Sequence, residues 1–326
     1  MTKQQIAIDL IKEKTGKDGK CTVSKSMLAK LLVEKYPTEF YSFEQARKIV
    51  RNVTGAGGIK NRKRLKITTE WKGLSLPEPE KNDYSKFLIK EKRIGILSDI
   101  HFPYYDKEAL NAAIAYLRKW KPDCILLNGD IIDCYAISRW DRDPRARSFK
   151  YELDMLRSFV QELRKIWPKA RIVLKCGNHS ERYEKLILQR VPELVDLELL
   201  TFENVISAKE LGIDVVKNKR VIVIGKLNVI HGHELPHGIA APVNPARGFF
   251  LKTKANVLGA HHHQSSDHSE SDLNGNIIGA WSTGCLCELH PDYAPINKWN
   301  HGFATVENFG SDFKVTNLRI IKGKVM

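Results

Sequence analysis

Five short segments of the chain combine aspartate, asparagine and histidine, the residue types that bind divalent cations through oxygen and nitrogen. Each segment follows an apolar run of the kind that forms a buried strand. In chain order the segments are Asp99-Ile100-His101, Asp130-Ile131-Ile132-Asp133, Asn178-His179, His231-Gly232-His233 and His261-His262-His263. Because ligands gather at the carboxyl ends of strands in an open α/β sheet, we expect these side chains to lie close together.

The donor set favours two hard or borderline cations over a closed structural zinc site. It offers oxygen and nitrogen ligands but no thiolate, which suits manganese best and also iron, zinc or nickel. Two cations about 3.5–4 Å apart that share a carboxylate form a common kind of hydrolytic site. A single histidine at a strand end is often only a hydrogen-bonded core residue, but five such segments in order argue against that interpretation for the whole set. We therefore expect two divalent metal ions as cofactors.

The elements that position these segments follow from the hydrophobic pattern. Buried strands are predicted at 94–97, 124–127 and 171–174, with helices between them near 106–120 and 149–166. This β-α-β-α-β order predicts a parallel sheet with right-handed crossovers. A second, mixed or antiparallel sheet is predicted from the apolar runs at 221–224, 227–230, 256–260, 277–282, 303–306 and 313–320.

The N-terminal part of the chain is basic and has a helical pattern. Residues 1–93 hold 22 Lys and Arg against 11 Asp and Glu, a net charge of +11, whereas residues 94–326 hold 31 against 27, a net charge of +4. Three short helices are expected, the second capped by Ser24 and the third opened by a capping box of Ser42 and Gln45. The basic run 60–66 follows them.

Three helices and a basic extension are typical of a helix-turn-helix with a wing or arm, in which the third helix reads DNA. The alternative is a helical cap on the main domain with a solvated basic face. On the first interpretation DNA is the expected partner, contacted by Arg47, Lys48, Arg51, Lys60, Arg62, Lys63 and Arg64.

These patterns divide the chain into a basic helical module at 1–71, a linker at 72–92 and a catalytic domain at 93–326. No apolar run approaches the 18 residues of a membrane span, and the N-terminus has no apolar signal region. The six cysteines form no CxxC pair and are interpreted as reduced thiols. A cytoplasmic protein of a bacterial or phage-infected cell is expected, with no membrane contact, and the pattern leaves the oligomeric state open.

The motif series resembles the calcineurin-like metallophosphoesterases, most closely their phage and bacterial members. The motifs are Asp99-x-His101, Gly129-Asp130-x-x-Asp133, Gly177-Asn178-His179, His231-Gly232 and His261-x-His263. Over residues 93–325 the resemblance implies an α/β fold, a four-layer α/β/β/α sandwich with a dinuclear metal centre. The expected architecture is this sandwich preceded by the small, winged helix-turn-helix-like helical domain.

The resemblance also implies roles for individual residues. One metal ion would be held by Asp99, His101 and His263, and the other by Asn178, His231 and His261. Asp130 would bridge both ions. His179 would be the catalytic histidine that is not a ligand, and Asp133 would orient it.

These roles imply a specific hydrolytic reaction. A hydroxide held by the metal ions would attack phosphorus, and protonated His179 would donate a proton to the leaving oxygen. Cys134 stands where protein phosphatases of this superfamily carry an arginine that grips phosphate, which argues against phosphoprotein substrates; Arg139, Arg142 and Arg182 are candidate replacements.

The expected function is hydrolysis of phosphodiester bonds, in DNA, by a nuclease or an enzyme that processes DNA ends. One alternative is a phosphatase or phosphodiesterase for nucleotides or another small phosphoester. The other is a DNA-binding scaffold without catalysis.

Overall fold

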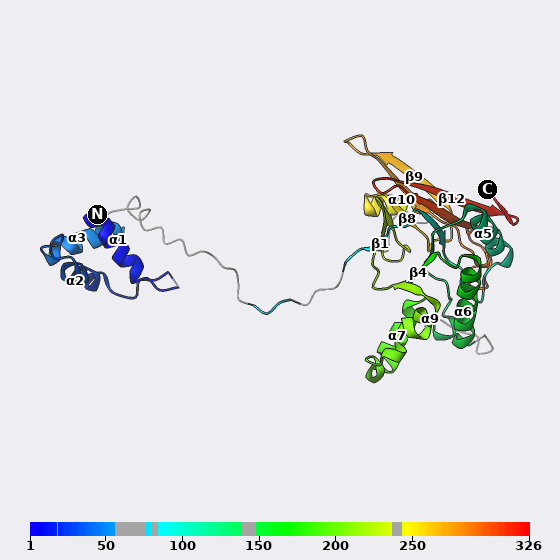
Figure 1. Cartoon of the computed structure of the whole chain (residues 1–326), viewed down its shortest axis with the longest axis horizontal. Helices are drawn as coiled ribbons and strands as arrows, with labels where there is room; N and C mark the ends of the chain where they lie inside the picture. The colour runs from blue at the N-terminus through cyan, green and yellow to red at the C-terminus, as the bar shows by residue number, and fades with distance from the viewer. Residues whose placement is uncertain (18, 56–75, 80–83, 139–147, 237–242) are drawn as a thin grey trace. The chain divides into compact units, whose positions relative to one another are not determined.

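The computed structural model describes residues 1–326 except 18, 56–75, 80–83, 139–147 and 237–242 (Figure 1). It divides into two compact units, Met1–Lys81 and Asn82–Met326. Within the described ranges, no helix is both long and apolar enough to cross a membrane.

The N-terminal unit contains the three helices that the sequence predicts: α1 (Lys3–Glu13), α2 (Lys25–Lys35) and α3 (Phe43–Val53). Each begins at a hydroxyl side chain that accepts a backbone N–H from the first turn: Thr2, Ser24 and Ser42. Such caps satisfy donors that the helix itself leaves unpaired. The helices enclose their own apolar core, which includes Ile6, Leu10, Leu28, Leu32, Phe40 and Val50.

The second unit is built on two sheets. The strands of the first sheet are β2 (Arg93–Leu97), β3 (Cys124–Asn128), β4 (Arg171–Lys175), β5 (Ile213–Val216), β11 (His301–Asn308), β12 (Phe313–Ile321) and β13 (Lys324–Val325). Their order is β13-β12-β11-β2-β3-β4-β5. Strands β2, β3 and β4 run parallel, as predicted, and β5, which the sequence analysis did not predict, adds a fourth parallel strand. β11 pairs antiparallel with both β2 and β12.

The second sheet is mixed. Its strands are β1 (Phe87–Ile89), β6 (Ile222–Ile224), β7 (Leu227–Val229), β8 (Val257–Gly259), β9 (Ser266–Ser271) and β10 (Ile277–Ser282). Their order is β1-β6-β7-β8-β10-β9. The helices of this unit are α5 (Lys107–Trp120), α6 (Phe149–Ile166), α7 (Glu181–Arg190), α8 (Phe202–Val205), α9 (Ala208–Leu211) and α10 (Pro245–Thr253). Short 3-10 turns lie at Tyr135–Ile137, Pro192–Leu194 and Glu198–Leu200.

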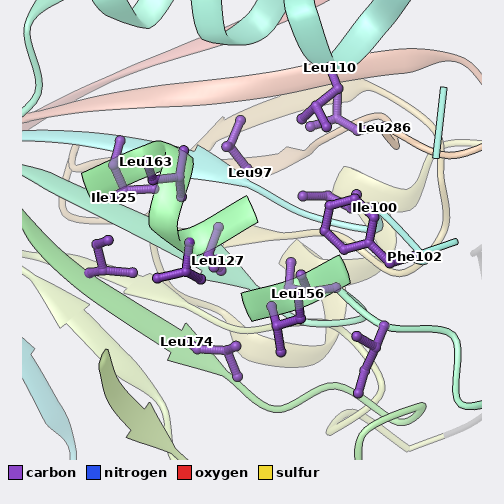
Figure 2. Close-up of a cluster of buried hydrophobic side chains, with 14 of the residues drawn as sticks. Leu97, Ile100, Phe102, Leu110, Ile125, Leu127, Leu156, Leu163, Leu174 and Leu286 are labelled. Atoms are coloured by element: carbon purple, nitrogen blue, oxygen red, sulfur yellow. The ribbon is translucent and has the colours of Figure 1, made fainter. Parts of the chain in front are cut away.

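The alternation of side chains along β3 defines the layers. Ile125 and Leu127 pack against helices α5 and α6, whereas Leu126 packs against the second sheet. Figure 2 shows the core between the first sheet and its helices, in which the labelled side chains are Leu97, Ile100, Phe102, Leu110, Ile125, Leu127, Leu156, Leu163, Leu174 and Leu286. On the far side of the second sheet, α10 buries Phe249 and Phe250 against Val257. The unit is therefore a four-layer α/β/β/α sandwich, as predicted.

Two details of the predicted layout differ from the structure. The runs at 303–306 and 313–320 were expected in the second sheet, but β11 and β12 extend the first sheet next to β2. A strand that pairs antiparallel needs no crossover helix, so the apolar pattern alone does not tell which sheet it joins. The expected linker 72–92 contains β1, which pairs with β6, so the second unit begins at Asn82.

Candidate metal centre

The five segments meet where strands of both sheets end. Asp99 and His101 follow β2, Asp130 follows β3, and Asn178 and His179 follow β4, at one edge of the parallel sheet. From the second sheet, His231 follows β7, and His261 and His263 follow β8. The sandwich thus brings the predicted donors from two sheets to a single place.

The backbone at this site adopts an unusual conformation. Five donor residues have left-handed φ values, namely Asp99 (51°), His101 (53°), Asp130 (50°), His261 (69°) and His263 (55°). This region is sparsely populated by residues with a Cβ atom, and strain of this kind clusters at functional sites. It turns the chain sharply enough for side chains two residues apart to face one point.

Two glycines allow the segments to approach one another. A Cβ atom on Gly129 would lie 2.2 Å from Nδ1 of His231, and one on Gly177 would lie 2.2 Å from Oδ1 of Asp130. Any larger residue at either position would push a donor segment out of place. The glycines that precede Asp130 and Asn178 are therefore requirements of the site.

One group of donors joins Asp99, His101 and His263. Oδ1 of Asp99 lies 3.2 Å from Nε2 of His263, and the Nε2 atoms of His101 and His263 are 3.3 Å apart. The other nitrogen of His101, Nδ1, lies 2.8 Å from Oδ1 of Asp133. A carboxylate on Nδ1 leaves Nε2 of His101 facing the other donors, as a metal ligand requires.

A second group joins Asp130, His231 and His261, whose ligand atoms lie within 4.8 Å of one another. Oδ2 of Asp130 is 3.1 Å from Nε2 of His231. Nδ1 of His231 lies 2.9 Å from the carbonyl oxygen of Asn128 and donates to it, which fixes Nε2 toward the carboxylate. Asp130 also accepts the backbone N–H of His179 on Oδ1, at 2.9 Å.

The chemistry of this donor set fits divalent cations. Among the described residues, the buried Oδ1 of Asn178 has no hydrogen-bond partner, and the carboxylates of Asp99 and Asp130 are buried among imidazoles. Buried polar atoms are normally paired, so an oxygen left without a partner at a cluster of ligand-type side chains fits the role of a cation ligand. The oxygens and nitrogens suit the metals that the sequence predicts.

The charges of the cluster are tightly balanced. Burial acts to raise the pKa of Asp130, but His231 and His179 outweigh it and hold that pKa well below its usual value. Burial acts to lower the pKa of His231, whereas Asp130 raises it, to about 10. Burial and the charge of His231 lower the pKa of His261 to about 3. Because an imidazole binds a metal only when it is unprotonated at the ligand atom, His231 would release a proton on binding a cation, and the affinity would depend on pH.

His179 is held at the rim of this cluster by Asp133 and Arg182. Its Nδ1 lies 2.7 Å from the carbonyl oxygen of Asp133 and 3.2 Å from the Asp133 carboxylate. Its Nε2 lies 3.0 Å from Nη2 of Arg182, whose Nη1 donates to the same carbonyl at 2.9 Å. Asp133 thus contacts His179, as expected, but its carboxylate lies closer to His101.

Of the three arginines considered as phosphate ligands, Arg182 lies at the site, and Arg139 and Arg142 fall outside the described residues.

The turn after Asp133 is fixed by a buried acid that the sequence did not single out. Glu152 of α6 accepts the backbone N–H groups of Cys134 and Tyr135. Burial raises the pKa of Glu152 to about 7, and the N–H of Cys134 opposes that rise. Glu152 lies in the first turn of α6, where acidic residues are common, so nothing in the local sequence predicts that it supports the site.

The predicted nucleic-acid contacts fall into two sets. Arg47, Lys48 and Arg51 are exposed on α3, opposite its buried residues Ala46 and Val50. Arg47 also forms an exposed ion pair of 3.3 Å with Glu44. The other predicted contacts, Lys60, Arg62, Lys63 and Arg64, lie outside the described residues, as does the predicted wing.

Comparison with known proteins defines the class. Residues 92–284 match the model of the calcineurin-like phosphoesterases, and the chain belongs to that family. It is therefore a metal-dependent phosphoesterase, a hydrolase that acts on phosphate esters, as the sequence predicted.

Individual relatives are distant. The Gene 54 protein of Mycobacterium phage L5 is 25% identical over 245 residues, which cover 72% of this chain and 95% of the phage protein. Among solved structures, Vps29 of Cryptosporidium parvum is 14% identical, with a TM-score of 0.40 over 73% of this chain and 96% of that one. YfcE, a phosphoesterase from E. coli, is 12% identical, with a TM-score of 0.32 over 69% of this chain and 98% of that one.

Proposed function

We propose that this phosphoesterase binds two divalent cations, preferably Mn²⁺, and hydrolyses phosphodiester bonds in DNA. The observation that carries the dinuclear part is the position of Asp130 between two groups of donors. Its Oδ2 lies 3.1 Å from Nε2 of His231 in the second group, and a ligand atom of Asp130 also lies within 4.8 Å of one on His101 in the first group. A carboxylate placed between two ligand sets is suited to bridge two cations.

When bound, the cations would lower the pKa of a coordinated water and neutralise charge on the phosphate oxygens. Asp99, His101 and His263 would hold one cation, and Asn178, His231 and His261 the other. Asp133 orients His101 through Nδ1, and the carbonyl of Asn128 orients His231 in the same way. These contacts fix the imidazole tautomers before any ligand arrives.

His179 supplies the proton that the leaving oxygen needs. Burial acts to lower its pKa, but Asp130 and Asp133 outweigh burial and raise the pKa above its ordinary value. The raised pKa favours the protonated form that a general acid needs, with Nδ1 held by Asp133. The guanidinium of Arg182, 3.0 Å from Nε2, opposes this rise. The N–H donors of Arg182 beside Nε2 are suited to bind the incoming phosphate.

Charge supports DNA as the substrate. Residues 1–93 carry a net charge of +11, and the exposed face of α3 presents Arg47, Lys48 and Arg51. Basic side chains in this arrangement bind phosphate backbones in a salt-dependent manner. The same metal centre would also hydrolyse a nucleotide or another small phosphoester, which is the alternative function.

The test is a parallel assay of the full-length, metal-free protein after addition of Mn²⁺. The substrates are bis(p-nitrophenyl) phosphate and labelled single- and double-stranded DNA. We expect cleavage of all three substrate types. His179→Ala should lose the cleavage of DNA, whose alkoxide leaving group needs the proton. A triple Arg47→Ala, Lys48→Ala, Arg51→Ala variant should lose DNA turnover but keep turnover of the small ester. Turnover of the small ester with intact DNA would support the alternative function and exclude DNA as substrate.

A further inference from the structure

An aromatic pair lies directly beside the metal centre, on the loop 288–300 that precedes β11. The ring of Trp299 packs edge-on against His263, with the ring centroids 4.2 Å apart. The ring of Tyr293 lies 6.2 Å from that of Trp299. The loop therefore places two aromatic side chains in series, leading outward from a predicted metal ligand.

Backbone hydrogen bonds hold this loop against the site. The N–H of Asn300 donates to the carbonyl of His263 at 2.9 Å, and the N–H of Glu288 donates to the carbonyl of Tyr104 at 2.8 Å. The side chain of Asn297 donates across the loop to the carbonyl of Ala294 at 2.7 Å. A loop fixed at both ends and braced inside presents its aromatic side chains at little entropic cost.

Tyr293 is exposed, yet its hydroxyl is subject to the charges of the site. The residue is 74% exposed. Burial of the hydroxyl and the nearby Asp133 carboxylate raise the pKa of Tyr293, while the guanidinium of Arg182 opposes this rise. The residue is thus largely open to solvent, while its hydroxyl lies within electrostatic reach of Asp133 and Arg182, the residues that hold His179.

We propose that Tyr293 and Trp299 form a subsite for the nucleobase adjacent to the phosphate that is hydrolysed. This inference rests on the proposed phosphodiesterase function and makes esters that carry an unpaired base the preferred substrates. A phosphate at the donor cluster would place the neighbouring base beside His263, where the aromatic pair begins. Aromatic side chains stack on any base, so the subsite selects nucleosides without reading sequence.

A role limited to bracing His263 does not account for the pair. Trp299 alone contacts the imidazole, whereas Tyr293 packs on the outer side of Trp299 and remains mostly exposed. The phosphate next to such a base would also find a charged donor, because the guanidinium of Arg182 lies beside His179 and within electrostatic reach of the hydroxyl of Tyr293. The guanidinium of Arg182, the aromatic pair and the general acid His179 together suit a nucleoside phosphoester.

The test compares two diesters with the same leaving group, thymidine 5′-(p-nitrophenyl phosphate) and methyl p-nitrophenyl phosphate. Each is hydrolysed by the full-length protein with Mn²⁺, and kcat and KM are measured separately. We expect wild type to favour the nucleoside ester by at least about fivefold in kcat/KM, mainly through KM, as base stacking would give. Tyr293→Ala should abolish most of that preference and leave turnover of the methyl ester unchanged, while Tyr293→Phe should retain it. Ile296→Ala, which removes a 95% exposed side chain from the same loop, is the matched control.

The outcomes separate this proposal from the proposed function. Hydrolysis of both esters at equal kcat/KM, or a preference that survives in Tyr293→Ala, would overturn the base subsite and leave the phosphodiesterase intact. A fall in the turnover of both esters by the same factor would show that Tyr293 acts only on the catalytic centre, and would overturn the subsite as well. Hydrolysis of neither ester by wild type would overturn both proposals.

Discussion

The ammonium group of Lys175 lies 2.9 Å from the carboxylate of Glu234, and both side chains are buried. Lys175 is the last residue of β4, just before the turn that carries Asn178. Glu234 accepts the backbone N–H groups of His231 at 3.0 Å and of Gly232 at 2.6 Å. The ion pair therefore links the turn that carries Asn178 to the turn that carries His231, and these two residues are the expected ligands of one metal ion.

Breaking this pair should destabilise the fold. Lys175→Met leaves the Glu234 carboxylate buried without its counter-charge, and we expect the free energy of unfolding at pH 7 to fall by ~3–5 kcal/mol. The double variant Lys175→Met, Glu234→Gln removes both charges and should recover most of the loss. Urea denaturation followed by circular dichroism measures both values. A single variant as stable as wild type would show that the pair does not hold the turns together.

The Lys175–Glu234 ion pair also predicts how the stability of the fold depends on pH. Burial acts to raise the pKa of Glu234, but Lys175 and the nearby histidines lower it to about 2, below its ordinary value of 4.5. A lowered folded-state pKa stabilises the protein above about pH 4.5, and that stabilisation is lost as the pH falls from about 4.5 to about 2. Glu234→Gln should lose less stability than wild type over this window, as urea titrations at pH 5, 4 and 3 would measure. Parallel losses in both proteins would contradict the assignment.

The sequence predicted that the donor side chains lie close together, because they all follow the ends of strands. A buried strand followed by aspartate or histidine is a local pattern, and the rule that ligands gather at the carboxyl ends of strands brings Asp99, Asp130 and Asn178 together without knowledge of the full topology. The residues that support the donors could not be predicted in this way. Glu234 acts through a partner 59 positions earlier, Lys175, and no spacing rule links the two.

For a related reason, the sequence alone could not predict which sheet β11 and β12 join. β11 and β12 have the apolar alternation of any half-buried strand, and only their packing shows that they join β2 rather than the second sheet. Trp299 was missed for the same reason, because its contact with His263 depends on how the loop before β11 folds back. The DNA-binding role of the N-terminal helices remains a prediction.

Arg182 should contribute to substrate binding more than to the proton transfer. Its guanidinium lies 3.0 Å from Nε2 of His179 and offers charged donors to a phosphate at that position. A hydrogen bond to a charged group contributes ~1.5–3 kcal/mol, so Arg182→Ala should raise KM about 10- to 100-fold for bis(p-nitrophenyl) phosphate. Arg182→Lys keeps the charge but loses the paired N–H donors, so its KM should lie between those of wild type and Arg182→Ala.

Steady-state kinetics at constant Mn²⁺ test this prediction, with Arg190→Ala at the C-terminal end of the same helix as the matched control. A KM that is unchanged in Arg182→Ala would place the phosphate elsewhere. A loss confined to kcat would instead assign Arg182 to the positioning of His179.

The most direct test of the central claim is the number of metal ions that the chain binds. Isothermal titration of the metal-free protein with Mn²⁺, checked by elemental analysis after dialysis, measures it. The position of Asp130 between two donor groups predicts two Mn²⁺ ions per chain, weakened binding in Asp130→Asn, and phosphodiesterase activity that a chelator abolishes and added Mn²⁺ restores. A single bound ion, or activity that persists after the metal is removed, would contradict the dinuclear centre.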